Sequence, residues 1–124
     1  MFSHVMVGSN NIDKAAEFYD KVLEPFGATR FLKNETRAGY STPDGGRFIV
    51  CTPFDKSAAT FGNGAMVSFK ATSADAVDAF YKAALAAGGK DEGPPGPRGA
   101  NTPPPYVAYV RDPDGNKLAA LHRP

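Results

Sequence analysis

The chain has 124 residues, a length that fits one domain and leaves no room for a two-domain enzyme. Hydrophobic residues make up 42% of it and charged residues 22%, with 14 Lys and Arg against 13 Asp and Glu, so extensive disorder and a nucleic-acid or membrane-surface role are not expected. The sequence contains no stretch of about 18 apolar residues and no signal-peptide pattern. Its one cysteine excludes an internal disulfide and a multi-cysteine zinc site. A cytoplasmic protein is therefore expected.

The first half of the chain predicts a strand, a helix and three further strands, in that order. A largely apolar stretch predicts the first strand near 2–8, and apolar side chains at i, i+3 and i+4 spacing predict a helix near 11–25. Asn10 is the expected N-cap, because Asp13 follows it three positions later as in a capping box, and Gly27 is the expected C-terminal cap. A Pro-Asp-Gly turn separates the last two of the three strands, which are expected near 29–34, 36–42 and 46–53.

The second half repeats this order after a shift of 62 residues. Residues 73–89 (SADAVDAFYKAALAAGG) match residues 11–27 (NIDKAAEFYDKVLEPFG) at an Asp, the Phe-Tyr pair, a Leu and the closing Gly, and they predict a helix near 73–87. Thr72 is the expected N-cap of this helix, and the glycine pair that follows is its expected C-terminal cap. The strands of this half are expected near 64–70, 104–111 and 116–122, and the repeat requires one more near 90–92.

A stretch rich in proline and glycine, 93–105 (GPPGPRGANTPPP), interrupts the second copy. The Pro-Asp-Gly turn recurs within 112–117 (DPDGNK), at 70 residues from the first copy instead of 62, and this stretch accommodates the extra residues. Because proline lacks a backbone N–H and fixes φ, 93–105 is expected to form neither a helix nor a central strand. It could serve as a lid or as a dimer-contact arm, and Arg98 within it could contact an anionic ligand or remain a solvated loop arginine.

Together these features resemble the vicinal oxygen chelate superfamily, which includes glyoxalase I, bleomycin-resistance proteins, fosfomycin-resistance proteins and extradiol dioxygenases. The resemblance covers essentially the whole chain and rests on the two repeated units, HVMV before a capped Phe-Tyr helix, GNG before the fifth strand, and RDPDGNK near the C-terminus. It implies an α+β fold in which two tandem βαβββ modules, 1–61 and 62–124, form a curved, partly open sheet around a cavity within one domain, 1–124. Small members of the superfamily typically form homodimers.

In this superfamily the metal ligands lie on the inward faces of the first and fourth strands of each module. The resemblance maps these positions onto His4, Ile49, Met66 and Ala119. Only His4 suits a hard divalent metal, since such ions need several nitrogen or oxygen donors. His122 has the opposite strand parity to Ala119, and the turn carboxylates Asp112 and Asp114 are expected to lie outside the cavity. No cofactor is therefore expected, and a divalent metal is disfavoured.

Residues of the same inward parity are expected to form a largely apolar ligand pocket. Tyr40 and Tyr106 could border this pocket or pack within their sheets. Cys51 could be a reactive thiol beside Arg47, but a small buried core residue is the favoured interpretation. The expected pocket residues are Met6, Tyr40, Ile49, Met66, Ser68, Tyr106, Ala119 and Leu121.

Three functions stay open at this point. The first is binding of a small organic molecule in an apolar cavity with a degenerate metal site, in the way that bleomycin-resistance proteins sequester a ligand. The second is a glyoxalase-like lyase or isomerase that uses His4 as its base, with or without a weakly held divalent metal, while extradiol dioxygenase chemistry is less expected. The third is a structural or regulatory dimer with a vestigial cavity. The expected partners are a small-molecule ligand and a second copy of the chain, with no nucleic acid and no membrane, and the cavity could lie within one chain or be shared across the dimer.

Overall fold

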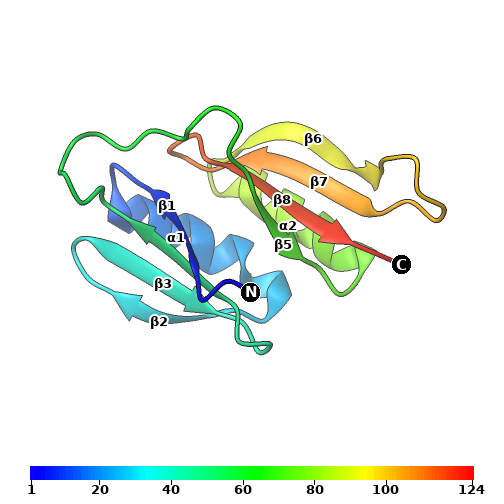
Figure 1. The fold of residues 1–124 in the computed structure, drawn as a ribbon, viewed down its shortest axis with the longest axis horizontal. Helices are drawn as coiled ribbons and strands as arrows, with labels where there is room; N and C mark the ends of the chain where they lie inside the picture. The colour runs from blue at the N-terminus through cyan, green and yellow to red at the C-terminus, as the bar shows by residue number, and fades with distance from the viewer.

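The computed structural model describes all 124 residues and consists of two four-stranded sheets, each with a helix on one face (Figure 1). Module 1 contains β1 (Val5–Gly8), α1 (Ile12–Val22), the 3₁₀ helix η1 (Glu24–Phe26), β2 (Thr29–Lys33), β3 (Arg37–Ser41) and β4 (Arg47–Cys51). Module 2 contains β5 (Val67–Lys70), α2 (Ala74–Ala86), β6 (Lys90–Pro97), β7 (Tyr106–Arg111) and β8 (Lys117–His122). The predicted α+β fold of two tandem βαβββ modules is confirmed. Neither helix is long and apolar enough to cross a membrane.

The two sheets have the same strand order. Sheet A runs β1-β4-β3-β2 and sheet B runs β5-β8-β7-β6, and in each the first strand pairs in parallel with the fourth. The strand that the repeat required near 90–92 is β6, which extends to Pro97 at the edge of sheet B. An edge position tolerates prolines, because one side of the strand needs no ladder hydrogen bonds. Residues 52–66 connect the modules (green in Figure 1), and the expected boundary after residue 61 falls within this segment.

The helix starts differ from the prediction by one residue. Asn11, not Asn10, caps α1 by accepting a hydrogen bond from the Lys14 N–H, and the Asn10 side chain instead bonds the backbone of Ala59. In the same way Ser73, and not the preceding threonine, caps α2. A side chain can satisfy only one of these roles, and the sequence alone does not show that the Asn10 side chain is used elsewhere.

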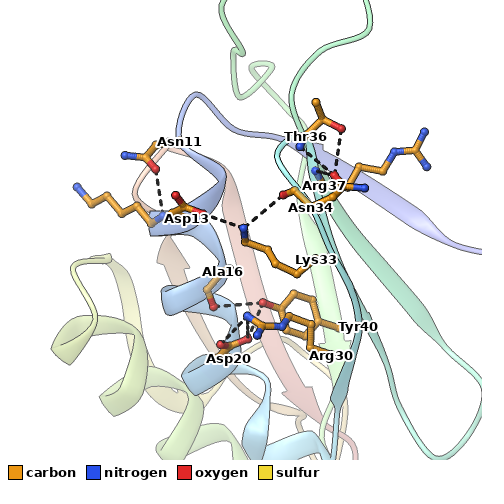
Figure 2. A network of polar contacts seen from close by, with 11 residues as sticks. Asn11, Asp13, Ala16, Asp20, Arg30, Lys33, Asn34, Thr36, Arg37 and Tyr40 are labelled. Carbon is orange, nitrogen blue, oxygen red and sulfur yellow. Dashed lines mark hydrogen bonds and ion pairs between the residues drawn. The ribbon is translucent and has the colours of Figure 1, made fainter.

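Module 1 illustrates how each helix is held on its sheet (Figure 2). The Tyr40 hydroxyl of β3 donates hydrogen bonds to Asp20 Oδ1 at 2.8 Å and to the Ala16 carbonyl at 3.2 Å, and Arg30 pairs with the same carboxylate at 3.0 Å. Burial, and then the Asp20 carboxylate, raise the pKa of Tyr40 well above its ordinary value, so the phenol stays protonated as a donor. The Tyr106 hydroxyl of module 2 reaches α2 in the same way, at Asp78 (2.7 Å).

One hydrophobic core spans both modules. Phe18 and Tyr19 of α1 and Phe80 of α2 are fully buried, and they belong to the same cluster as the helix-facing side chains of both sheets. The opposite side of each sheet, here called the open face, carries the alternate strand residues, because successive side chains of a strand point to opposite sides. The two modules are therefore joined through their helix-facing sides, while both open faces are left without a covering layer.

Candidate functional site

A cavity of about 830 Å³ lies between the two modules, bordered by η1, the β3–β4 turn and β5. It is called the seam cavity below. Half of its 20 lining residues are hydrophobic. The apolar lining includes Phe2, Val5, Phe26, Phe48, Met66 and Phe69. Since these residues come from both modules, the seam cavity exists only when the modules are docked.

Three phenylalanine rings form the floor of the seam cavity. The Phe69 ring of β5 lies 5.6 Å from the Phe26 ring of η1 and 5.3 Å from the Phe48 ring of β4, measured between ring centroids. Phe80, behind this floor, packs against both Phe26 and Phe69. Aromatic rings at these distances attract one another beyond simple area burial. The floor is therefore a packed and well-defined apolar surface.

The rim of the seam cavity is polar and exposed. Its one carboxylate, Asp44, accepts hydrogen bonds from the Thr42 hydroxyl and from the Gly46 N–H, and these bonds lower the pKa of Asp44 below its ordinary value. The cations of the rim are Lys70 at the end of β5 and Arg47 at the start of β4, whose guanidinium lies 4.8 Å from the centroid of the Phe31 ring. A ligand in the cavity would thus meet an apolar floor and charged groups at its opening.

A buried polar cluster fixes how the modules dock. Asp112 of the DPDG turn is only 3% exposed and accepts hydrogen bonds from the Tyr19 hydroxyl, from the side chain of Asn116 (2.9 Å) and from the backbone N–H groups of Asp114 and Asn116 (2.9 Å each). The Asn116 amide also donates to the Gly8 carbonyl of β1 at 2.9 Å. Asp112 does not line the seam cavity. It is buried instead, because Tyr19 of α1 in module 1 closes over the turn.

Burial raises the pKa of Asp112 above its ordinary value of 3.8, against the lowering effect of its hydrogen bonds from Tyr19 and Asn116. A carboxyl whose pKa is higher in the folded state favours folding most when it is protonated. Its contribution to stability is complete below about pH 3.8 and is lost as the pH rises through the folded-state pKa. We expect the free energy of unfolding, measured by urea titration at pH 3–7, to decline across this window relative to Asp112→Asn. Parallel pH profiles for the two proteins would contradict the shift.

Comparison with known proteins agrees with this architecture. Residues 1–120 match the family described as the glyoxalase/bleomycin resistance protein/dioxygenase superfamily. The chain belongs to this superfamily. A solved glyoxalase/bleomycin resistance protein from Albidiferax ferrireducens T118 is 46% identical, with a TM-score of 0.91 over 100% of this chain and 99% of that one. No curated protein matches the sequence.

More distant solved structures of the superfamily share the fold alone. A glyoxalase-related enzyme from Fulvimarina pelagi is 19% identical, with a TM-score of 0.76 over 100% of this chain and 88% of that one. A lactoylglutathione lyase from Agrobacterium tumefaciens is 20% identical, with a TM-score of 0.70 over 98% of this chain and 92% of that one. The function of this superfamily member must therefore be argued from its own residues.

Of the four residues that the resemblance maps onto metal positions, only His4 carries a side chain that suits a hard divalent metal. No group of three or more His, Cys, Asp or Glu side chains in the chain is arranged to hold an ion. His4 directly precedes β1, is exposed, and makes its side-chain hydrogen bond with the Ser3 hydroxyl at 2.8 Å. Ile49 and Ala119 pair in register with Met6 and Ser68. No catalytic step through a metal is derived for this chain.

The predicted pocket residues fall into three groups. Met66, Ser68 and Tyr40 line the seam cavity, Tyr40 from the helix-facing side. Tyr106 also faces a helix, but it lies outside the cavity. The remaining predicted residues lie on the open faces and outside the seam cavity: Met6, Ile49, Ala119 and Leu121. The alternation of side chains along the strands thus grouped the residues of the open faces, but it did not predict the seam cavity between the modules.

Two further predicted residues have defined surroundings. Arg98 lies against the Tyr109 ring of β7, 5.6 Å from its centroid, and donates a hydrogen bond to the Pro94 carbonyl at 2.5 Å. Lys117 lies 5.3 Å from the same ring. Cys51 is partly exposed at the end of β4 and not a core residue as expected, and burial raises the pKa of its thiol, which favours the unreactive protonated form.

The sequence did not reveal most of the seam cavity. Phe26, Phe48 and Phe69 have the pattern of ordinary core residues, and nothing in their spacing shows that their rings meet across the modules. Lys70 and Arg47 carry no motif.

Proposed function

We propose that this superfamily member binds a small organic molecule in the seam cavity. The observation that carries the proposal is the cavity itself, about 830 Å³ with three packed phenylalanine rings at its floor. Small-molecule sites in proteins are mostly apolar hollows of about 300–1,000 Å³ with a few polar groups that orient the ligand. Both the size and the polar rim of the seam cavity fit that description.

We also propose that binding needs no metal, because the metal site of the superfamily is degenerate in this chain. Three of the four mapped positions are the apolar residues Ile49, Met66 and Ala119. The fourth, His4, donates no orienting hydrogen bond to a carboxylate, which a histidine base commonly does. These features support binding of a ligand more than its chemical conversion. Separately, the one free cysteine fits a cytoplasmic location.

A homodimer is proposed as the assembled form. Met6, Phe31 and Met66 are each 45–47% exposed, and they lie on the open faces, which no layer of this chain covers. Exposed apolar surface of this kind marks interaction sites in proteins. A second copy that lays its own open faces on these would bury it, and sedimentation velocity would then give the mass of two chains.

The binding proposal is tested with N-phenyl-1-naphthylamine, a neutral apolar fluorophore. We expect saturable binding at one probe per chain, unaffected by EDTA, and a loss of affinity of about tenfold or more in Met66→Glu, because a charge would then line the apolar cavity. Met6→Glu is the matched control. Met6 is 46% exposed and Met66 47%, both lie on open faces, and only Met66 lines the seam cavity.

Equal losses in the two variants would place the probe on the open faces or at a dimer interface and would contradict the seam-cavity site. Binding that EDTA abolishes and a divalent metal restores would contradict the degenerate metal site. Circular dichroism of both variants shows whether the fold is retained, so that a loss of binding refers to the cavity.

A further inference from the structure

We propose that the ligand of the seam cavity is an amphipathic monocarboxylate, held with its carboxylate between Lys70 and Arg47 and its apolar body on the phenylalanine floor. This inference rests on the proposed function and names the ligand class. It comes from the distribution of charge and of unused hydrogen-bond donors around the cavity, which is uneven.

The cations at the rim have no carboxylate partner within the chain. Its ion pairs join Arg30 to Asp20, Lys33 to Asp13 and Arg111 to Glu92. Arg47 and Lys70 are in none of them, and neither side chain makes a hydrogen bond within the chain, although both line the seam cavity. Two of the three charged side chains in the lining are therefore cations without an ion pair, and of these the Arg47 guanidinium also lies against the Phe31 ring.

The third charged residue, Asp44, offsets these cations only in part: the charge of Lys70 contributes to the lowered pKa of Asp44, but the lining still holds two cations against one carboxylate. Its carboxylate is held in the β3–β4 turn by the Thr42 hydroxyl and the Gly46 N–H, and it forms no ion pair within 4.0 Å with Lys70 or Arg47. Its lowered pKa keeps it ionised, so it would repel a second carboxylate placed beside it. The rim therefore has room for one anionic group, near the cations, and disfavours a ligand with several.

The neutral polar groups point to the same chemistry. The hydroxyls of Ser68 and Thr72 line the cavity and make no hydrogen bond within the chain. Together with the Lys70 ammonium and the Arg47 guanidinium they are donors without acceptors. A carboxylate offers acceptors and a negative charge, so it complements this set, whereas the two cations would repel an ammonium and an alcohol offers one uncharged acceptor.

The two cations belong to different modules, since Arg47 begins β4 and Lys70 ends β5. A carboxylate between them would link the modules across the seam while the apolar body of the ligand rests on rings from both. Bound decanoate is therefore expected to raise the melting temperature of the protein, because it binds only the docked arrangement of the modules.

The test is displacement of N-phenyl-1-naphthylamine by decanoate and by 1-decanol, which share a ten-carbon chain and differ in the charged group. We expect decanoate to bind about tenfold more tightly than 1-decanol at low salt, from two partly exposed charge contacts. In the double variant R47Q/K70Q this ratio of affinities should fall to about one. The control K14Q/K21Q removes two exposed charges from α1, outside the cavity, and should keep the wild-type ratio.

A decanoate-to-decanol ratio near one in the wild type, with both displacing the probe, would overturn the monocarboxylate and leave the proposed function intact. A ratio that falls equally in R47Q/K70Q and K14Q/K21Q would overturn the assigned cations, because only the overall charge would then matter. If the probe itself does not bind, the proposed function fails and this inference with it.

Discussion

Phe80→Ala will lower the free energy of unfolding by about 3–5 kcal/mol, the cost of removing a large buried ring and leaving a cavity behind. Phe80 is fully buried on α2, and its ring centroid lies 5.8 Å from that of Phe26 and 6.3 Å from that of Phe69. The substitution therefore removes core packing and also the ring that packs behind Phe26 and Phe69 in the floor of the seam cavity. Urea denaturation followed by circular dichroism measures the loss.

Leu85→Ala is the control for this substitution. Leu85 lies on the same helix but is 40% exposed, so its truncation should cost less than about 1 kcal/mol. The Phe80 variant should also bind N-phenyl-1-naphthylamine more weakly, because Phe26 and Phe69 lose the ring that holds them in place. A loss of less than 1 kcal/mol in Phe80→Ala would contradict the single core shared by both modules.

Asp112→Ala will destabilise the fold by about 3 kcal/mol or more. The carboxylate is the acceptor for the Tyr19 hydroxyl, the Asn116 side chain and two backbone N–H groups, and each buried donor left unpaired costs about 1–3 kcal/mol. Because Tyr19 lies in module 1 and Asp112 in module 2, the loss should also loosen the docking of the modules. Thermal and urea denaturation would measure it.

The corresponding hairpin of module 1 offers the control. Asp44 also accepts hydrogen bonds in a Pro-Asp-Gly turn, but it is exposed, so water replaces its partners and Asp44→Ala should cost less than about 1 kcal/mol. If the two alanine variants were equally stable, the buried cluster at Asp112 would have no special part in joining the modules.

The regular elements were predictable because their signals are local. Apolar periodicity, the Phe-Tyr pairs and the Pro-Asp-Gly turns marked both helices and seven of the eight strands, and the repeat supplied the eighth, β6, where composition argued against it. The cap of α1 was not predictable in this way, because the partner that occupies the Asn10 side chain, Ala59, is 49 residues away in the chain.

The candidate site was predictable only in part. Met6, Ile49 and Ala119 share the open faces, in keeping with their common parity, but they lie outside the seam cavity. Tyr40 and Tyr106 face the helices, because hydroxyl partners on α1 and α2 satisfy them there. An aromatic residue on a strand fits either side of a sheet, so the sequence left both positions of these tyrosines open.

The sequence by itself determined that two copies of one unit build this protein, since this follows from residue types repeated at a fixed spacing. Only the tertiary structure decided that Asp112 is buried, that Phe26, Phe48 and Phe69 share one floor, and that Arg47 and Lys70 lie at one rim. These features depend on how the two modules dock. Docking is governed by contacts between residues far apart in the chain, such as Tyr19 and Asp112, which leave no periodic signal in the sequence.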